Sequence, residues 1–207
     1  MPMRLDLSPG AVLLSGRLLD DAPALLTGLA PILECAPLRH MQTRRGYFMS
    51  VAMTNCGDVG WVSDRRGYRY SALDPASGQP WPPMPAAFCE LATRLAAEAG
   101  FAGFHPDACL INRYDIGARL GLHQDKDEAD FSAPIVSCSF GLPATFLWGG
   151  ATRHDKTQKI RLEHGDVLIW GGAARLYFHG VQPIRAGVHP DVGDFRLNLT
   201  FRQALAR

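Results

Sequence analysis

From residue 107 to its end, the chain alternates apolar and polar residues in short runs that Gly, Pro and Asp separate. This period of two is typical of β-strands, because successive side chains point to opposite faces of a sheet. About eight short strands in series predict a double-sheet jelly roll or barrel, which buries the apolar face of each strand. The predicted strands are Ala108–Tyr114, Leu120–Gln124, Pro134–Leu142, Thr145–Trp148, Lys159–Leu162, Asp166–Trp170, Arg175–His179 and Arg196–Arg202.

The first third of the chain carries helical signals instead. One helix is expected to begin near Asp20-Asp21-Ala22-Pro23, a capping signature, and to be kinked at Pro31. Its apolar residues recur at helical spacing: Leu25, Leu26, Leu29, Ile32 and Leu33. A second helix follows Pro85 and ends at Gly100, with an apolar stripe of Phe88, Leu91, Ala92 and Leu95.

These patterns predict a mainly β fold with α: a double-stranded β-helix (jelly roll) with the N-terminal helices buttressing one sheet. Between the helices, residues 45–75 are rich in Gly, aromatics and Arg, so we expect short strands and loops there rather than core.

Length and composition predict one globular domain, residues 1–207. Hydrophobic residues make up 47% and charged residues 20%, and no Ser/Gly-rich stretch suggests a linker. The longest apolar runs are too short to span a bilayer and the first residues lack a signal-peptide core, so we expect a soluble, cytoplasmic protein without membrane contact. The five scattered cysteines form no CxxC pair and are expected to be buried, reduced thiols.

Charge is balanced overall but not locally. The net charge of +1 gives no sign of nucleic-acid binding and no reason to expect more than a monomer. Between residues 36 and 75, however, six arginines stand against three aspartates. Such an excess suits phosphates, and it equally suits a solvated basic face.

His123, Asp125 and His179 are candidate metal ligands. The first two stand two apart, so an extended chain would point both side chains the same way, and His179 lies in another predicted strand. Two imidazoles and one carboxylate leave open positions on a metal, as in non-haem Fe(II) oxygenases. Catalytic zinc also uses three ligands, and the HxD spacing alone also occurs on polar surface strands. His164 is the strongest rival ligand, although its surroundings predict a hairpin turn.

The strand at Phe195–Arg202 has two opposite faces. Its polar face carries Arg196, Asn198, Thr200 and Arg202, and its other face is apolar. Because guanidinium groups bind carboxylates in a bidentate manner, the two arginines could hold a dicarboxylate. Asn112 and Tyr114 share a face of an earlier strand and could donate to the same anion. The alternatives are a strand facing water and an ordinary buried Asn and Tyr.

Six segments also match one known family: Met49–Gly57, Gly60-Trp61, Gly67–Ser71, Pro106–Tyr114, Leu122–Glu128 and Asn198–Gln203. From about residue 40 onward the chain resembles the AlkB family of Fe(II)- and 2-oxoglutarate-dependent nucleic-acid dealkylases, above all its bacterial members. Residues 1–35 match only loosely.

The resemblance implies a catalytic Fe(II) centre with 2-oxoglutarate and O2 as co-substrates. Its metal ligands would be His123, Asp125 and His179. Its 2-oxoglutarate residues would be Arg196 at the distal carboxylate, Asn112, Tyr114 and Asn198 beside it, and Arg202 near the keto end.

For the substrate, the resemblance implies a nucleotide-recognition lid at 40–75 over a jelly-roll core at 107–207. The residues matching substrate contacts are Trp61, Tyr68, Asp127 and Arg153, although the loop 151–158 departs from the family pattern. Trp61 would stack on an extruded base, and the Asp127 carboxylate would favour a cationic one. Taken alone, Trp61 would equally suit core packing, and Asp127 a solvated turn.

The implied activity is oxidative demethylation of N-alkylated bases of the 1-methyladenine and 3-methylcytosine type. The substrate would be single- or double-stranded DNA, with RNA as the second candidate, and the products formaldehyde, succinate and CO2. One alternative is a 2-oxoglutarate oxygenase acting on a modified tRNA base or a protein side chain. Another, from a different class, is a cupin-like binding protein without catalysis.

Overall fold

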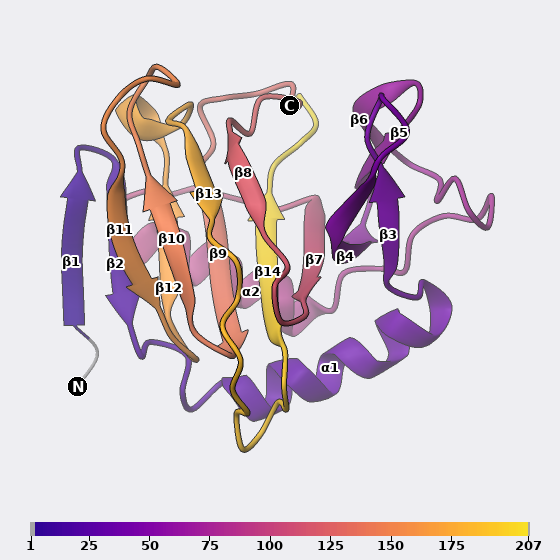
Figure 1. Ribbon diagram of the computed structural model, residues 1–207, viewed down its shortest axis with the longest axis horizontal. Coiled ribbons are helices and arrows are strands. Elements are labelled where there is room, and N and C mark those ends of the chain that lie inside the picture. The colour runs from indigo at the N-terminus through magenta and orange to yellow at the C-terminus, as the bar shows by residue number, and fades with distance from the viewer. Residues whose placement is uncertain (1–2, 207) are drawn as a thin grey trace.

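Two β-sheets face each other in the computed structural model, which describes residues 3–206. Figure 1 shows the smaller sheet in front of the larger one, with the helix α2 (Ala86–Glu98) behind both. The larger sheet has eight strands in the order β1 (Met3–Ser8), β2 (Ala11–Ser15), β12 (Val167–Trp170), β9 (Ile135–Gly141), β14 (Arg196–Arg202), β7 (Ala108–Tyr114), β4 (Phe48–Gly57) and β3 (Arg39–Gln42).

The smaller sheet has four strands, in the order β11 (Gln158–Leu162), β10 (Ala144–Trp148), β13 (His179–Val181) and β8 (Leu120–His123). Neighbouring strands in both sheets are antiparallel. A separate hairpin of β5 (Gly60–Asp64) and β6 (Gly67–Ser71) stands beside the larger sheet, and we call it the lid hairpin. This arrangement confirms the predicted jelly roll.

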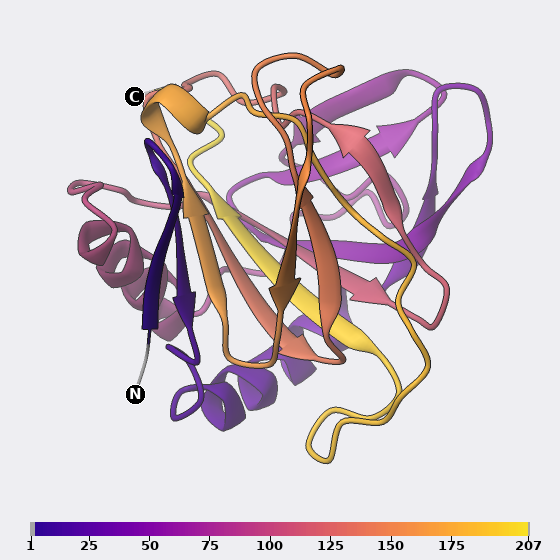
Figure 2. The same ribbon diagram turned by 60° about the vertical axis from the view of Figure 1, so that its left-hand side comes forward.

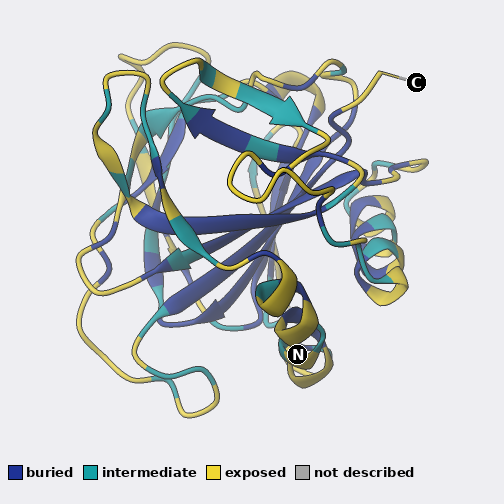
Figure 3. Ribbon diagram, turned by 90° about the vertical axis from the view of Figure 1, so that its right-hand side faces the viewer, coloured by how far each residue is buried: buried dark blue, intermediate teal, exposed yellow. Residues whose placement is uncertain are grey.

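The larger sheet has an apolar layer on each face. Between the sheets, side chains such as Ile135 and Leu168 pack against Phe146 and Trp148 of the smaller sheet. On the other face, α2 and the helix α1 (Ala22–Cys35) cover the strands, and the rings of Phe88 and Phe201 meet edge to face at 6.2 Å. Figure 3 shows the inner strands buried while the outer turns of both helices are exposed. The predicted buttressing by helices is therefore confirmed.

Most predicted strands lie within one residue of the observed ones, and Ala108–Tyr114 and Arg196–Arg202 match at both ends. Arg175–His179 is wrong as a strand. A 3-10 helix at Gly172–Ala174 leads into a turn, and β13 begins only at His179. The physical reason is that the Arg175 side chain turns inward to donate to the backbone carbonyls of Asp125 and Ala133.

Other expectations need correction in the N-terminal half. The first third is not all helical, because β1 and β2 extend the larger sheet by pairing with β12. Residues 45–75 are not outside the core, because β4 pairs along β7 and is buried from Val51 to Cys56. The predicted helix is confirmed as α1, which runs from Ala22 to Cys35 with Pro31 inside it.

The prediction that all five cysteines are buried, reduced thiols is only partly confirmed. All five cysteines are free thiols, but only Cys56, Cys109 and Cys138 are buried, while Cys35 is exposed. Within residues 3–206, no helix has the length and apolar character needed to cross a membrane.

Candidate active site

The three predicted metal ligands converge between the two sheets. The register of β8 and β13 sets His123 directly opposite His179, and their ring centroids are 4.5 Å apart. β8 ends at His123, so Asp125 lies in the extended segment that follows it. The Asp125 carboxylate lies 3.6 Å from His123 Nε2 and 3.7 Å from His179 Nε2. An ion with bonds of about 2.1 Å can bridge ligand atoms at such separations.

Backbone carbonyls orient both imidazoles. His123 Nδ1 lies 2.9 Å from the carbonyl oxygen of Gly121, and His179 Nδ1 lies 2.9 Å from that of Tyr177. These contacts place the ring proton on Nδ1, which leaves each Nε2 lone pair directed at the shared space. Burial, together with the nearby His123, lowers the pKa of His179 to about 4, so its imidazole is neutral near pH 7 and able to bind a metal.

Arg202 controls the charge of the candidate ligand Asp125. Burial alone would raise the pKa of Asp125, but Arg202 and the two imidazoles outweigh it and lower that pKa. Arg202 Nη2 donates to Asp125 Oδ2 at 2.8 Å, which leaves Oδ1 turned toward His123. The donor set is therefore two imidazole nitrogens and one carboxylate oxygen, and it fits a divalent ion such as Fe(II).

Arg196 is a buried cation with donors that lack a protein partner. Its side chain is 2% exposed, its Nη2 donates to Ser139 Oγ at 2.8 Å, and its Nε and Nη1 are unpaired. Burial lowers the pKa of Arg196 to about 10, which still leaves it charged at neutral pH. Because an unpaired buried charge is costly, this guanidinium fits a ligand carboxylate.

The rest of the polar face of β14 is also buried, which excludes the alternative of a strand facing water. Asn198 and Thr200 are 7% and 5% exposed. Asn198 Nδ2 donates to Ser137 Oγ at 2.8 Å, and Asn112 Nδ2 donates to Asn198 Oδ1 at 3.2 Å. Asn112 Oδ1 lacks a partner, and Tyr114 lies opposite Arg196 in the strand register. A cavity is lined by Asn112, Tyr114, Ser137, Asn198, Thr200 and Arg202, whose polar atoms suit a small diacid such as 2-oxoglutarate.

The lid hairpin contributes two aromatic side chains to the cavity that the three candidate metal ligands line. Trp61 and Tyr68 stack on each other with centroids 5.6 Å apart. Trp61 Nε1 also donates to Asp127 Oδ2 at 2.8 Å, which ties the hairpin to the segment carrying Asp125. Trp61 therefore lines the cavity, and the carboxylate of the exposed Asp127 bonds to its indole N–H.

A cavity of about 280 Å³ brings most of the predicted residues together. Its lining includes Trp61, Tyr68, Asn112, Tyr114, His123, Asp125, Asp127, His179, Asn198 and Arg202. Sequence reasoning assigned no site role to several other lining residues, among them Met49, Met53, Gln124, Glu128, Ser137, Trp170 and Thr200. The alternation of β14 already placed Thr200 beside the arginines, whereas no sequence signal pointed to the two methionines.

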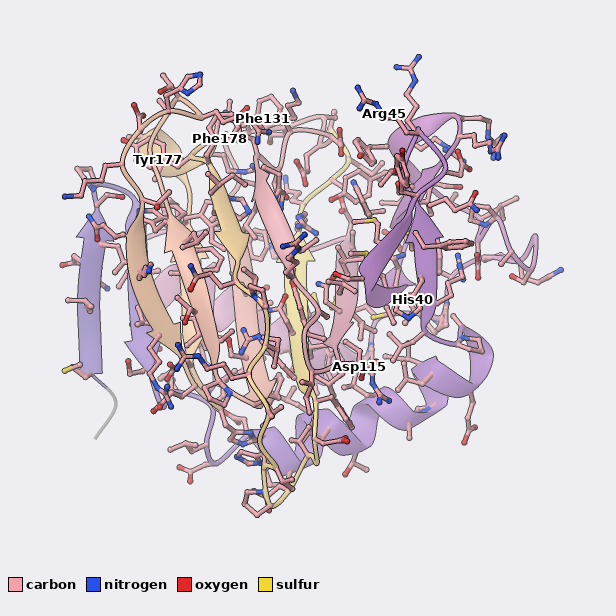
Figure 4. All side chains as sticks on the ribbon, viewed as in Figure 1. His40, Arg45, Asp115, Phe131, Tyr177 and Phe178 are labelled. Carbon is pink, nitrogen blue, oxygen red and sulfur yellow. The ribbon has the colours of Figure 1, made fainter. Side chains whose placement is uncertain are left out.

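Two predicted site residues, Arg196 and Arg153, are not in this lining. Arg196 is buried beside Ser139, whereas Arg153 is at the surface. It stands on the exposed β10–β11 loop, with its guanidinium carbon 5.2 Å from the centroid of the Phe178 ring. Figure 4 labels Phe178 at the upper end of the smaller sheet.

His164, the rival ligand, occupies the predicted turn between β11 and β12 and belongs to a second group with His189 and Asp191. His189 comes from the β13–β14 connection, which extends beyond one end of the sheets (Figure 2). The two rings are stacked at 4.2 Å and nearly parallel, at 16°. An ion cannot lie in both ring planes at once, so this group does not have the geometry of a shared metal site.

Comparisons with known proteins agree with this geometry. The family model of the 2OG-Fe(II) oxygenase superfamily matches residues 10–202. The chain is 53% identical to alpha-ketoglutarate-dependent dioxygenase AlkB of Salmonella typhimurium and equally to that of Escherichia coli, over 98% of this chain and 94% of each relative. A solved structure of OsALKBH1 has a TM-score of 0.85 at 33% identity, covering 97% of this chain and 100% of that chain. The chain therefore belongs to the 2OG-Fe(II) oxygenase superfamily and, within it, to the AlkB family.

Proposed function

We propose that this protein removes methyl groups from base nitrogens of alkylated nucleic acid by oxidative demethylation, with DNA as the main substrate and RNA as a second one. The observation that carries the proposal is that the metal ligands and the aromatic pair of the lid hairpin line the same cavity. A base entering past Trp61 would bring its substituent toward His123 and Asp125. The AlkB and nucleic acid dioxygenase names of relatives support the same substrate class.

The chain's own residues position the reactants in this proposal. His123, Asp125 and His179 would hold Fe(II). Arg196 and Arg202, with Asn112, Tyr114 and Asn198, would bind and orient 2-oxoglutarate. When bound, the iron and 2-oxoglutarate supply oxidation by O2, with succinate and CO2 as products. The hydroxylated methyl group then leaves the base nitrogen as formaldehyde.

The lid residues would select the base. Trp61 offers a ring for stacking, and base stacking on aromatic side chains contributes about 1–3 kcal/mol per base. The Asp127 carboxylate next to it favours rings that carry positive charge, such as 1-methyladenine and 3-methylcytosine. Tyr68 would extend this aromatic surface, and Arg153 would contact the strand from the exposed loop.

Residues 40–75 would act as a nucleotide-recognition lid on the jelly-roll core at 107–207, within one domain that spans residues 1–207. We propose that the protein works as a monomer, in keeping with its modest net charge of +1, and that it does so in the cytoplasm, where 2-oxoglutarate is present.

A panel of methylated oligonucleotides tests the proposal. The purified protein with Fe(II) is incubated with strands carrying 1-methyladenine, 3-methylcytosine or an uncharged methylated base, with and without 2-oxoglutarate, and mass is measured. We expect loss of one methylene mass from the two cationic lesions only when 2-oxoglutarate is present. His123→Ala should abolish the change, whereas His154→Ala, at an exposed loop position, should leave it intact. An unchanged panel accompanied by succinate formation would point to another substrate, and an unchanged panel without succinate to a binding protein.

A further inference from the structure

Glu128 is a buried carboxylate that contacts three separate parts of the fold. Its side chain is 2% exposed. Tyr70 Oη, on β6 of the lid hairpin, donates to Glu128 Oε1 at 2.8 Å. Arg202 Nε lies 3.2 Å from the same oxygen, and Arg175 Nη2 lies 3.1 Å from Oε2. One carboxylate therefore joins the lid hairpin, β14 and the turn that precedes β13.

Both arginines are fixed by other contacts as well. Arg175 donates from Nη1 to the carbonyl of Asp125 at 2.7 Å and from Nε to that of Ala133 at 3.0 Å. Its guanidinium carbon also lies 5.4 Å from the centroid of the Phe131 ring. Arg202 binds the Asp125 carboxylate. Because both cations also hold Asp125 or its backbone, Glu128 is connected to the candidate metal ligand through two independent routes.

The two arginines pair with Glu128 without satisfying all of its hydrogen-bonding atoms. Arg202 Nε and Glu128 Oε2 lie within ion-pair distance of a partner but are not aligned for a hydrogen bond. The Tyr70 hydroxyl is thus a well-directed donor to a buried carboxylate, a class of hydrogen bond stronger than one between neutral groups. Burial raises the pKa of Tyr70 well above its usual range, so the hydroxyl keeps its proton at neutral pH.

We propose that Glu128 is a positioning residue that latches the lid hairpin onto the metal-binding segment through Tyr70, so that the lid is held over the cavity by the same carboxylate that braces Arg202 and Arg175. Trp61 and Asp127 make a second tie close by, but at the exposed rim. The Tyr70–Glu128 bond is the inner of the two. Its importance for nucleic-acid binding rests on the proposed function, whereas the latch itself does not.

The test uses Tyr70→Phe, which removes one hydroxyl and leaves Glu128 paired with both arginines. Hydrogen exchange of the backbone amides in residues 60–71 is measured by mass spectrometry on the full-length protein. Because a lost bond to a charged group makes local opening easier, exchange there should become about tenfold faster. Tyr177→Phe is the matched control, since Tyr177 lies outside the lid hairpin and packs against Trp148 at 5.7 Å. Unchanged exchange at 60–71 in Tyr70→Phe would overturn the proposal.

Glu128→Gln tests whether the Glu128 carboxylate also braces the metal-binding segment through Arg175 and Arg202. It keeps the shape and an acceptor for Tyr70 but removes the charge that pairs with Arg175 and Arg202. We expect Mn(II) affinity to fall by at least about tenfold in Glu128→Gln, because Arg202, which bonds to the candidate ligand Asp125, loses its partner. In Tyr70→Phe the affinity should stay within about twofold of wild type. Equal Mn(II) affinity in Glu128→Gln and wild type would refute the bracing of the metal-binding segment.

Oligonucleotide binding is measured in parallel on the same variants. Tyr70→Phe should raise the KM for a methylated strand by about tenfold with little change in kcat, because the hydroxyl acts on the lid and not on the reacting atoms. Exchange at 60–71 could rise in Tyr70→Phe while neither the wild type nor any variant demethylates a strand. In that case the proposed function fails and the latch stands. If demethylation occurs with identical exchange in Tyr70→Phe and wild type, the latch fails alone.

Discussion

Arg196 Nη2 donates to Ser139 Oγ at 2.8 Å, and this bond is the only side-chain hydrogen bond that the buried guanidinium makes within the described part of the chain. The bond joins β14 to β9, two neighbouring strands of the larger sheet. It fixes one edge of the guanidinium and leaves Nε and Nη1 available next to Tyr114. The free-energy cost of removing this cation from water arises when the protein folds, before any ligand binds. The buried guanidinium is therefore already positioned for an anion.

Replacing Arg196 by Lys keeps the charge but removes the planar fork. We expect the Kd for 2-oxoglutarate to rise by about 10- to 100-fold, since hydrogen bonds to a charged carboxylate are lost. Isothermal titration with Mn(II) in place of Fe(II) measures this without turnover. Arg113→Lys on β7 is the control, because Arg113 pairs with Asp115 and lies over the Phe195 ring. Similar Kd values in Arg196→Lys and wild type would remove Arg196 from the diacid site.

Removing one imidazole should remove the metal. In His123→Ala we expect Mn(II) affinity to fall by more than about 100-fold, because only Asp125 and His179 remain as ligands. Wild type with Fe(II) and 2-oxoglutarate under anaerobic conditions should also show a weak visible absorption band, which His123→Ala should lack. A wild-type protein that takes up Zn(II) but shows no such band would contradict an iron site that binds 2-oxoglutarate.

Trp61→Ala tests the lid surface. The change removes the stacking ring and the hydrogen bond to Asp127, so affinity for a methylated single strand should fall by about 5- to 150-fold. Slow conversion of 2-oxoglutarate without nucleic acid should change by less than about twofold, because the Trp61 ring stacks on Tyr68 and donates to Asp127, two residues assigned to the base and not to 2-oxoglutarate. Trp61→Phe keeps a ring and should lose less affinity. Nucleic-acid binding equal to wild type in Trp61→Ala would favour a substrate other than a base.

The sequence predicted well where periodicity carries the signal. The alternation from Arg196 to Arg202 gave both the strand and its polar face, because a period of two leaves only one assignment of sides. The helical spacing of apolar residues likewise predicted the two helices, whose apolar stripes pack on the larger sheet.

Contacts between distant segments were not predictable in this way. The Glu128–Arg175 pair joins residues 47 positions apart, and no periodic pattern indicated that these two side chains meet. The segment before His179 reads as a strand in sequence but forms a turn, because Arg175 bonds to the Asp125 segment instead of presenting its backbone to a neighbouring strand. Tertiary contacts of this kind override local preference.

Leu199→Ala measures how far the apolar face of β14 supports the fold. Leu199 is fully buried between β7 and β9, on the face that the helices cover. The free energy of unfolding should fall by about 2–5 kcal/mol, from lost burial and the cavity left behind. Val188→Ala, at a site 78% exposed, is the control and should change stability by less than about 0.5 kcal/mol. Urea unfolding compares the two, and equal losses would contradict the packing described for Leu199.

His164 should make stability depend on pH. Gly141 N–H donates to His164 Nδ1 at 3.1 Å, and burial together with His189 lowers the pKa of His164, against a smaller opposing effect of Asp191. A His whose pKa is lowered on folding is neutral in both states above its unfolded pKa of about 6.5, so it has no effect there. As pH falls below that value, the unfolded chain takes up the proton first, and the folded state loses stability until the folded-state pKa of His164 is passed.

His164→Asn keeps an acceptor for Gly141 without this titration. Urea unfolding from about pH 7.5 to about pH 5 should therefore show wild type losing stability relative to the variant. Parallel pH profiles would mean that the imidazole takes up its proton in the fold as readily as in the unfolded chain, which the backbone bond from Gly141 does not allow.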